Sequence, residues 1–219
     1  LGQVYTYDAH YPRATKVLDM RLSTALATLP QYETKHLTFR YGGKSHHLKI
    51  NYDKQTVEFF RTYPQLDISM YFSSVIQPKT SKQLLERLKP LVIGKSELDA
   101  INLLLGFVQT AFEYKTDKAQ FGEENYLFPE ETLFYPYSDC EDRSILFAWL
   151  VKNLLGLEVI GLDYPGHIAT AVRFNGKVNG MSIRYQGRRY MITDPTFINA
   201  RAGMVMPQFK KTNPKVIKF

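Results

Sequence analysis

The spacing of hydrophobic residues predicts a mixed amino-terminal part of the chain. Residues 14–30 carry apolar side chains at helical spacing, which predicts a helix. Residues 36–60 contain short runs of strand-forming residues punctuated by turn pairs such as Gly42-Gly43, which predicts short strands. We therefore expect an amino-terminal α+β portion over residues 1–75, whose role is not legible from its sequence.

Helical spacing dominates after residue 80. Residues 81–92 fit a helix that Ser81 caps and that Pro90 ends or kinks. Residues 96–115 fit a second helix that begins after Ser96. Apolar residues cover most of the surface of this second helix, so we expect it to be buried.

The remaining pattern predicts a loop, a buried helix and a small sheet. Residues 116–138 contain two prolines and many polar groups, which indicates a long irregular loop, and such loops are usually functional or disordered. The helix that starts at or just before Cys140 is apolar all round and stops at Gly156. β-rich runs then follow at residues 157–164, 167–174 and 189–194.

Composition limits the class of protein. A chain of 219 residues with 44% hydrophobic content can bury one good core. No apolar run approaches the roughly 20 residues needed to cross a bilayer, and the amino terminus does not resemble a signal peptide. The chain begins at Leu1 and not at Met, which leaves open the removal of a leader and a periplasmic or secreted location.

Charge and metal-binding residue types argue against several functions. The net charge is +7, yet the basic residues are scattered, which argues against nucleic-acid binding. A single cysteine cannot form an internal disulfide. The five histidines show no metal-ligand spacing, and His46 and His47 point to opposite faces of an extended segment. We expect no metal and no cofactor.

The single cysteine is the strongest candidate for chemistry. Cys140 lies at the first turn of a buried helix, where the helix dipole favours a thiolate. Its neighbours Asp139, Glu141 and Asp142 are good helix starters, but their charges would oppose a thiolate if they pointed at the sulfur. A reactive Cys140 therefore needs a positive group, and His167 is the candidate because it opens a strand directly after a turn.

Asp194 is the candidate for the group that orients the imidazole. It closes the predicted strand 189–194, and it would meet His167 if the strands of these two residues are antiparallel neighbours. This geometry requires that residues 175–187 add no net reversal of chain direction.

These residues together resemble a known family. Ser-Asp-Cys-Glu-Asp at 138–142 ahead of an apolar helix, Gly-His-Ile at 166–168 and Ile-Thr-Asp-Pro-Thr at 192–196 resemble the transglutaminase-like cysteine-enzyme superfamily. The superfamily includes bacterial transglutaminase-like peptidases and acyl-transferring transglutaminases. The resemblance covers about residues 96–207. It implies an α+β fold with a papain/transglutaminase-like core, in which the nucleophile helix packs on an antiparallel sheet, within a catalytic domain over residues 76–219.

The resemblance also implies roles for individual residues. Cys140 is expected to be the nucleophile, His167 the general base and acid, and Asp194 the orienting carboxylate. Asp142 matches a position that we interpret as structural. The sequence departs from the family at Ser138, where many members have glycine.

The sequence assigns only one of the two donors that an oxyanion would need. The backbone N–H of Cys140 would supply one donor to a developing oxyanion. Gln109, Tyr114 and Tyr137 are alternatives for the second donor. We interpret Trp149 and the pair Met204 and Met206 as packing residues.

The implied reaction is acyl transfer through a thioester. With water as acceptor the protein is a cysteine peptidase or amidase that acts on a peptide or protein, and we favour this hydrolytic reading. With an amine as acceptor it is a crosslinking transglutaminase. A non-catalytic binding module on the same fold and a thiol redox sensor are further alternatives.

Overall fold

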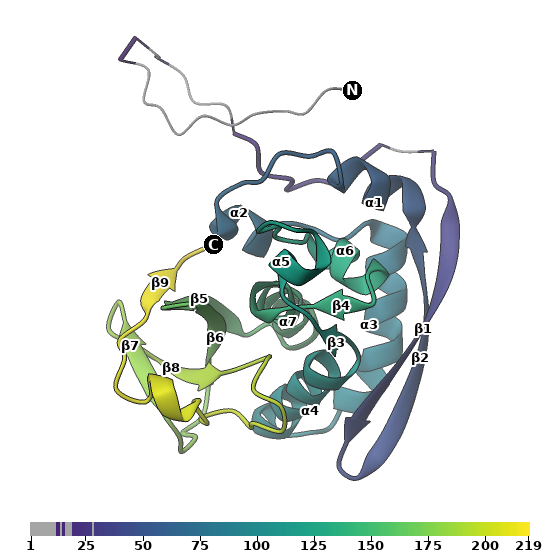
Figure 1. The fold of residues 1–219 in the computed structure, drawn as a ribbon. Helices are drawn as coiled ribbons and strands as arrows, with labels where there is room; N and C mark the ends of the chain where they lie inside the picture. The colour runs from purple at the N-terminus through teal and green to yellow at the C-terminus, as the bar shows by residue number, and fades with distance from the viewer. Residues whose placement is uncertain (1–11, 14, 16–18, 28) are drawn as a thin grey trace.

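Helices fill the centre of the molecule, with a two-stranded hairpin on one side and a five-stranded sheet on the other (Figure 1). This computed structural model describes residues 12–13, 15, 19–27 and 29–219. The helices are α1 (Lys54–Phe60), α2 (Ile68–Phe72), α3 (Pro78–Val92), α4 (Glu97–Thr110), α5 (Asp117–Gln120), α6 (Pro129–Phe134) and α7 (Cys140–Leu155). The strands are β1 (Tyr32–Tyr41), β2 (Lys44–Asp53), β3 (Glu113–Tyr114), β4 (Tyr137–Ser138), β5 (Glu158–Tyr164), β6 (His167–Arg173), β7 (Ser182–Tyr185), β8 (Arg188–Thr193) and β9 (Lys215–Ile217).

The hairpin of β1 and β2 confirms the predicted turn at Gly42-Gly43. Both glycines have positive φ, 59° and 74°, as a two-residue hairpin turn that matches the strand twist requires. Alternate residues such as Leu37 and Phe39 are buried, and this face packs on α3 and α4. His46 and His47, on β2, make separate contacts: one stacks on Phe39 and the other bonds Thr38.

The strand prediction for residues 36–60 is wrong at its end. Residues 54–60 form α1, because Asp53 caps this helix instead of opening a turn. One carboxylate oxygen of Asp53 accepts a bond of 3.1 Å from the N–H of Gln55, and the other accepts 2.9 Å from the hydroxyl of Thr56.

The helix predicted over residues 14–30 is absent from its described part. Residues 19–27 and 29–30 are not helical, and positions 14, 16–18 and 28 lie outside the described residues. The carbonyl of Met20 accepts from the hydroxyl of Tyr63 (2.9 Å), and that of Leu22 accepts from the N–H of Val75 (3.3 Å). Tertiary hydrogen bonds have therefore replaced the bonds of a helix.

The two central helices were predicted with two errors of boundary, one at the start of α3 and one at the end of α4, which stops at Thr110 and not at residue 115. α4 begins after Ser96, whose hydroxyl accepts 3.1 Å from the N–H of Asp99, as predicted. α3 begins at Pro78 and not after Ser81, because the buried carboxylate of Glu130 anchors its first turn through Thr80 (2.7 Å). Pro90 lies inside α3, which continues to Val92.

Residues 116–138 are more regular than predicted. They contain α5, α6 and β4, and β4 pairs with β3 in parallel. Pro129 misled the prediction, because proline at the first position of a helix starts α6 instead of breaking it.

The carboxyl-terminal half confirms the predicted buried helix and antiparallel strands. α7 is buried without interruption from Glu141 to Val151, and Gly156 ends it in the left-handed conformation (φ 65°). The sheet order is β7-β8-β6-β5-β9, with every neighbouring pair antiparallel. One face of β5 and β6 packs on α7.

One hydrophobic core connects residues from both sides of position 75. It joins the hairpin, α3, α4 and α7 with the sheet, and the ring of Phe219 stacks on that of Phe72 at 4.7 Å. The architecture is therefore α+β with an antiparallel sheet. Within the described residues, every helix is too short or too polar to span a membrane.

Candidate active site

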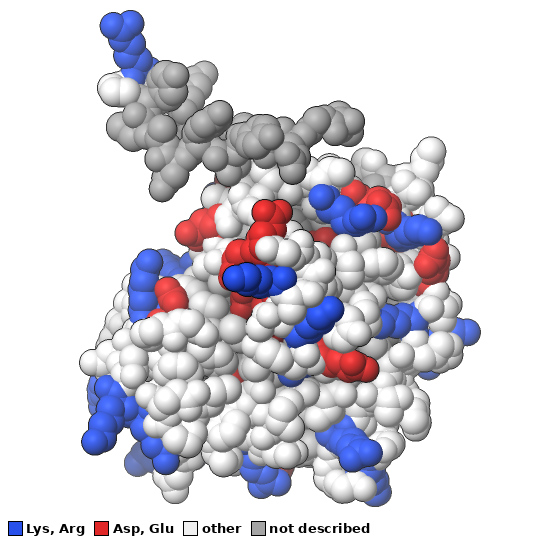
Figure 2. Space-filling model, in the orientation of Figure 1, with Lys and Arg blue, Asp and Glu red and all other residues white. Residues whose placement is uncertain are grey.

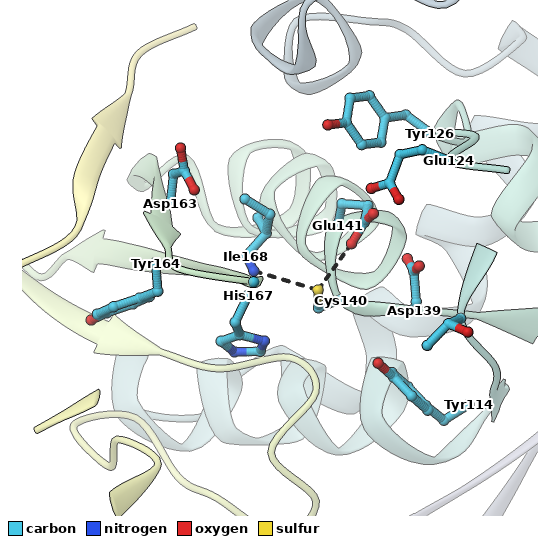
Figure 3. A pocket seen from close by; sticks show the side chains of 12 residues that line it. Tyr114, Glu124, Tyr126, Asp139, Cys140, Glu141, Asp163, Tyr164, His167 and Ile168 are labelled. Atoms are coloured by element: carbon cyan, nitrogen blue, oxygen red, sulfur yellow. Dashed lines mark hydrogen bonds between the residues drawn. The ribbon is translucent and has the colours of Figure 1, made fainter. Parts of the chain in front are cut away.

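Cys140 is the first residue of α7, and β6 holds it in place. The backbone N–H of Ile168, on β6, donates to its Sγ at 3.4 Å, and the carbonyl of Ile168 accepts from the hydroxyl of Ser144 at 3.2 Å. The thiol itself donates to Oε2 of Glu141 at 2.9 Å (Figure 3). The sulfur therefore lies between a helix start, a strand start and a carboxylate.

The structure brings His167 and Asp194 together. β6 and β8 are antiparallel neighbours, and Nε2 of His167 lies 3.0 Å from Oδ2 of Asp194. The segment between them adds β7, but β7 pairs with the outer edge of β8 and leaves the β6–β8 pairing direct. Both side chains are buried, with 8% and 3% of their surface exposed.

Several contacts fix this pair. Oδ1 of Asp194 accepts from the N–H groups of Thr196 (2.9 Å) and Phe197 (3.0 Å), which closes a tight turn. The ring of Phe209 lies parallel to the imidazole with centroids 5.2 Å apart. Because the carboxylate can only accept, Nε2 of His167 carries the hydrogen and Nδ1 is left as an acceptor.

Cys140 and His167 line the same pocket, which has a volume of about 330 Å³. Among the hydrogen bonds of the described residues none joins the sulfur to the imidazole. All three residues of the expected triad thus meet at one place, although the thiol is bonded to Glu141 and not to His167.

Burial and a neighbouring acid both oppose ionisation of the Cys140 thiol. Burial raises the pKa of Cys140 well above its ordinary value, and the adjacent carboxylate of Glu141 raises it further. The acidic neighbour does point at the sulfur, as the sequence had left open, and both burial and this carboxylate oppose a thiolate.

Further carboxyl groups gather behind Glu141. Burial and the charge of Asp139 raise the pKa of Asp117 to about 7, and burial and the charge of Glu141 raise that of Asp139 to about 8. Asp142 is fully buried, and its two oxygens accept from the N–H groups of Leu127 (3.0 Å) and Asp139 (3.3 Å). Asp142 therefore ties the start of α7 to the preceding loop.

Two triplets of these acids have oxygen atoms within 4.8 Å of one another and could hold a cation. They are Asp117 with Asp139 and Asp142, and Asp117 with Glu124 and Glu141. Backbone N–H groups already occupy oxygens of three members, including Asp117, which accepts from Asn125 at 2.8 Å. Sequence spacing gave no sign of this cluster, because Asp117 opens α5 and Glu124 lies in the loop before α6, both distant in sequence from the start of α7.

Arg143 is a site residue that sequence reasoning missed. It is 1% exposed, and its guanidinium donates to the hydroxyl of Ser138 (3.0 Å) and the carbonyls of Phe112 (2.9 Å) and Gln109 (3.4 Å). This contact also explains why a serine stands at position 138, where many members of the resembled family have glycine. Its hydroxyl accepts a hydrogen bond from the Arg143 guanidinium. An arginine three residues after the cysteine in an otherwise apolar helix was the available signal.

The three candidates for a second oxyanion donor differ in position. The side-chain amide of Gln109 already donates to the backbone carbonyls of Asp194 (3.0 Å) and Ala200 (3.1 Å), so its hydrogens are not directed at an oxyanion. Tyr137 is not among the residues that line the pocket, whereas Tyr114 is, and its hydroxyl points toward Cys140 (Figure 3).

A second hollow of about 470 Å³ adjoins the first on the other side of His167. Both are lined by Tyr114, Gly166 and His167. Met206, which is half-buried, and the 48%-exposed Ile198 help line it. Met204 is 46% exposed, so the interpretation of it as a packing residue is wrong. Trp149 is buried in the core, as expected.

No protein-family model, curated protein or solved structure matches this chain.

Proposed function

We propose that this protein is a cysteine-dependent acyl-transfer enzyme, a peptidase or amidase, that works on a transglutaminase-like core. The observation that carries the proposal is the shared pocket of Cys140 and His167, with Asp194 bonded to the far nitrogen of the imidazole. A nucleophile, a base and an orienting carboxylate together are what thioester chemistry requires.

The first half-reaction forms a thioester. Nδ1 of His167 takes the thiol proton while Sγ of Cys140 bonds to the substrate carbonyl carbon, whose π electrons move to its oxygen. When the tetrahedral intermediate collapses, the C–N bond breaks and the imidazolium returns the proton to the leaving amine. Asp194 stabilises the imidazolium and keeps the ring oriented.

Water completes the reaction. His167 removes a proton from water as the water oxygen attacks the thioester carbon. The C–S bond then breaks, and the imidazolium returns this proton to the leaving sulfur, which gives a carboxylic acid, the free thiol and the neutral imidazole.

The oxyanion has two donors in this proposal. The N–H of Cys140 is at the first helical position, where it has no acceptor within the helix. The hydroxyl of Tyr114 supplies the second donor from the opposite wall of the pocket.

The bond between Cys140 and Glu141 means that the resting thiol must be released before it reacts. Catalytic hydrogen bonds are often long or misdirected without substrate and form only in the complex. The same bond also favours a second candidate, a non-catalytic binding module on the same fold, in which the thiol is an inert part of the pocket wall.

Covalent trapping separates the two candidates. A peptidyl acyloxymethyl ketone should add to Cys140 of the wild type, as read by intact mass and peptide mapping. The adduct should be absent in Cys140→Ala and at least tenfold slower in His167→Ala. Labelling that is equally fast in the His167 variant would indicate an ordinary thiol and overturn the catalytic proposal.

A further inference from the structure

The pocket beside Cys140 is acidic, although the chain as a whole is basic. Four carboxylates line it: Asp139 and Glu141 at the start of α7, Glu124 in the loop before α6, and Asp163 on β5. Apart from His167, no residue of its lining can carry a positive charge. Figure 2 shows Lys and Arg spread over the molecular surface, with a group of Asp and Glu in the region of α2 and α5. This contrast with a net charge of +7 points to a cationic ligand.

One of these acids is buried against another. Asp139 is 5% exposed, its Oδ1 accepts from no N–H or hydroxyl group of the described residues, and its side chain is hydrogen-bonded to that of Glu141. None of the four acids forms an ion pair with a Lys or Arg in the described part of the chain. An acid buried against another acid is costly, and a bound cationic donor beside them would reduce that cost.

The shape of the pocket fits a side chain better than a metal ion. The carboxylates lie on different walls, with Asp163 on one side and Glu124 with Glu141 on the other (Figure 3), and Asp163 belongs to neither triplet of converging oxygens. The volume is about ten times the roughly 30 Å³ that one water occupies. The hydroxyls of Tyr114 and Tyr126 add acceptors, which suits a group with several N–H donors.

We infer, on the basis of the proposed function, that this pocket binds the side chain of a Lys or Arg that flanks the scissile bond of a peptide substrate. The bound cation lies beside Glu141 and opposes the influence of that carboxylate on the sulfur. The basic residue therefore raises the rate of acylation as well as the affinity.

Binding to a variant that cannot react tests the inference separately from catalysis. A fluorescent neutral peptide is prepared with Lys at each position in turn, and with Nε-acetyl-lysine or Glu at the same positions. At one position Lys should bind Cys140→Ala roughly tenfold more tightly than acetyl-lysine, as expected for charge-assisted hydrogen bonds. Equal affinities at every position would overturn the inference.

Variants of the pocket rim identify the site. Glu124→Gln combined with Asp163→Asn, in the Cys140→Ala background, should reduce the preference for Lys at least threefold. Glu86→Gln, an exposed acid on α3, should leave it unchanged. A preference that survives the double variant would place the cation elsewhere and refute the assignment.

Three further results separate the other outcomes. If micromolar Ca²⁺ alone raises the melting temperature and EDTA abolishes peptide binding, the acids hold a metal and the inference is wrong. If Cys140→Ala prefers Lys but the wild type forms no adduct, the pocket assignment stands and the proposed catalysis fails. If the wild type cleaves Lys and acetyl-lysine peptides equally, catalysis stands and the pocket assignment fails.

Discussion

The hydrogen bond from Cys140 to Glu141 makes the reactivity of the thiol depend on one neighbouring charge. The two atoms are 2.9 Å apart. Coulomb's law with an effective dielectric constant of about 20 gives an upper bound of about 6 kcal/mol for a thiolate beside this carboxylate. Charges this close commonly shift a pKa by about 1–3 units. We therefore expect Glu141→Gln to lower the pKa of the thiol by about 2 units.

Iodoacetamide alkylation measures this change. A fall of about 2 units raises the thiolate fraction about 100-fold at a pH below both pKa values, but it lowers the intrinsic nucleophilicity about 8-fold for a Brønsted coefficient near 0.45. The rate at pH 8 should thus rise about tenfold, and the pH–rate profile should move to lower pH.

The control for this experiment is Glu86→Gln, which removes an equal charge far along the chain on α3. Its alkylation profile should coincide with that of the wild type. A Glu141→Gln profile that is unmoved, or moved to higher pH, would refute the view that this carboxylate sets the thiol pKa.

Four other outcomes follow from the site. Asp194→Asn should lower kcat/KM about 100-fold or more, because the imidazole loses its ionised acceptor, while the melting temperature changes little because the amide oxygen still accepts from Thr196 and Phe197; an active variant would remove Asp194 from the mechanism. Tyr114→Phe should lower kcat about 100-fold with little change in KM if its hydroxyl donates to the oxyanion. A rise in KM as large as the fall in kcat would contradict that role. Arg143→Met should destabilise the protein by about 3 kcal/mol in urea unfolding, because buried carbonyls lose their donors; a change below about 1 kcal/mol would show that water replaces it. The raised pKa values of Asp117, about 7, and Asp139, about 8, mean that the folded state holds protons that the unfolded state releases near pH 4; stability should fall as the pH rises from about 4 to 8, less steeply in Asp117→Asn, and a rise would contradict it.

Local patterns predicted the elements whose structure depends on neighbours in sequence. The run of apolar residues after Cys140 and the stop at Gly156 define α7, because burial on all sides needs apolar residues on all sides. The glycine pair at 42–43 defines the hairpin turn, since two consecutive positive φ angles favour glycine. The strands that begin at His167 and end before Asp194 were also predicted, although their pairing was only a condition of the hypothesis.

Tertiary contacts decided where local preference was weak or misleading. Residues 19–27 have helical spacing, yet hydrogen bonds from Tyr63 and Val75 hold them in another conformation. A buried carboxylate, Glu130, moved the start of α3. Both cases involve partners more than 40 positions away, which periodicity does not register.

The sequence by itself placed Cys140 at the start of a buried helix and named His167 and Asp194 as its candidate partners, because the helix and strand patterns are local. The pairing of β6 with β8, which brings the latter two together, came from the tertiary structure. Only the tertiary structure decided the charge around the sulfur. Asp117, Glu124 and Asp163 arrive from separate segments, and the direction of the Glu141 side chain is a choice between rotamers. Electrostatic energies depend on distances of a few ångströms and on burial, and neither is encoded in the order of residues alone.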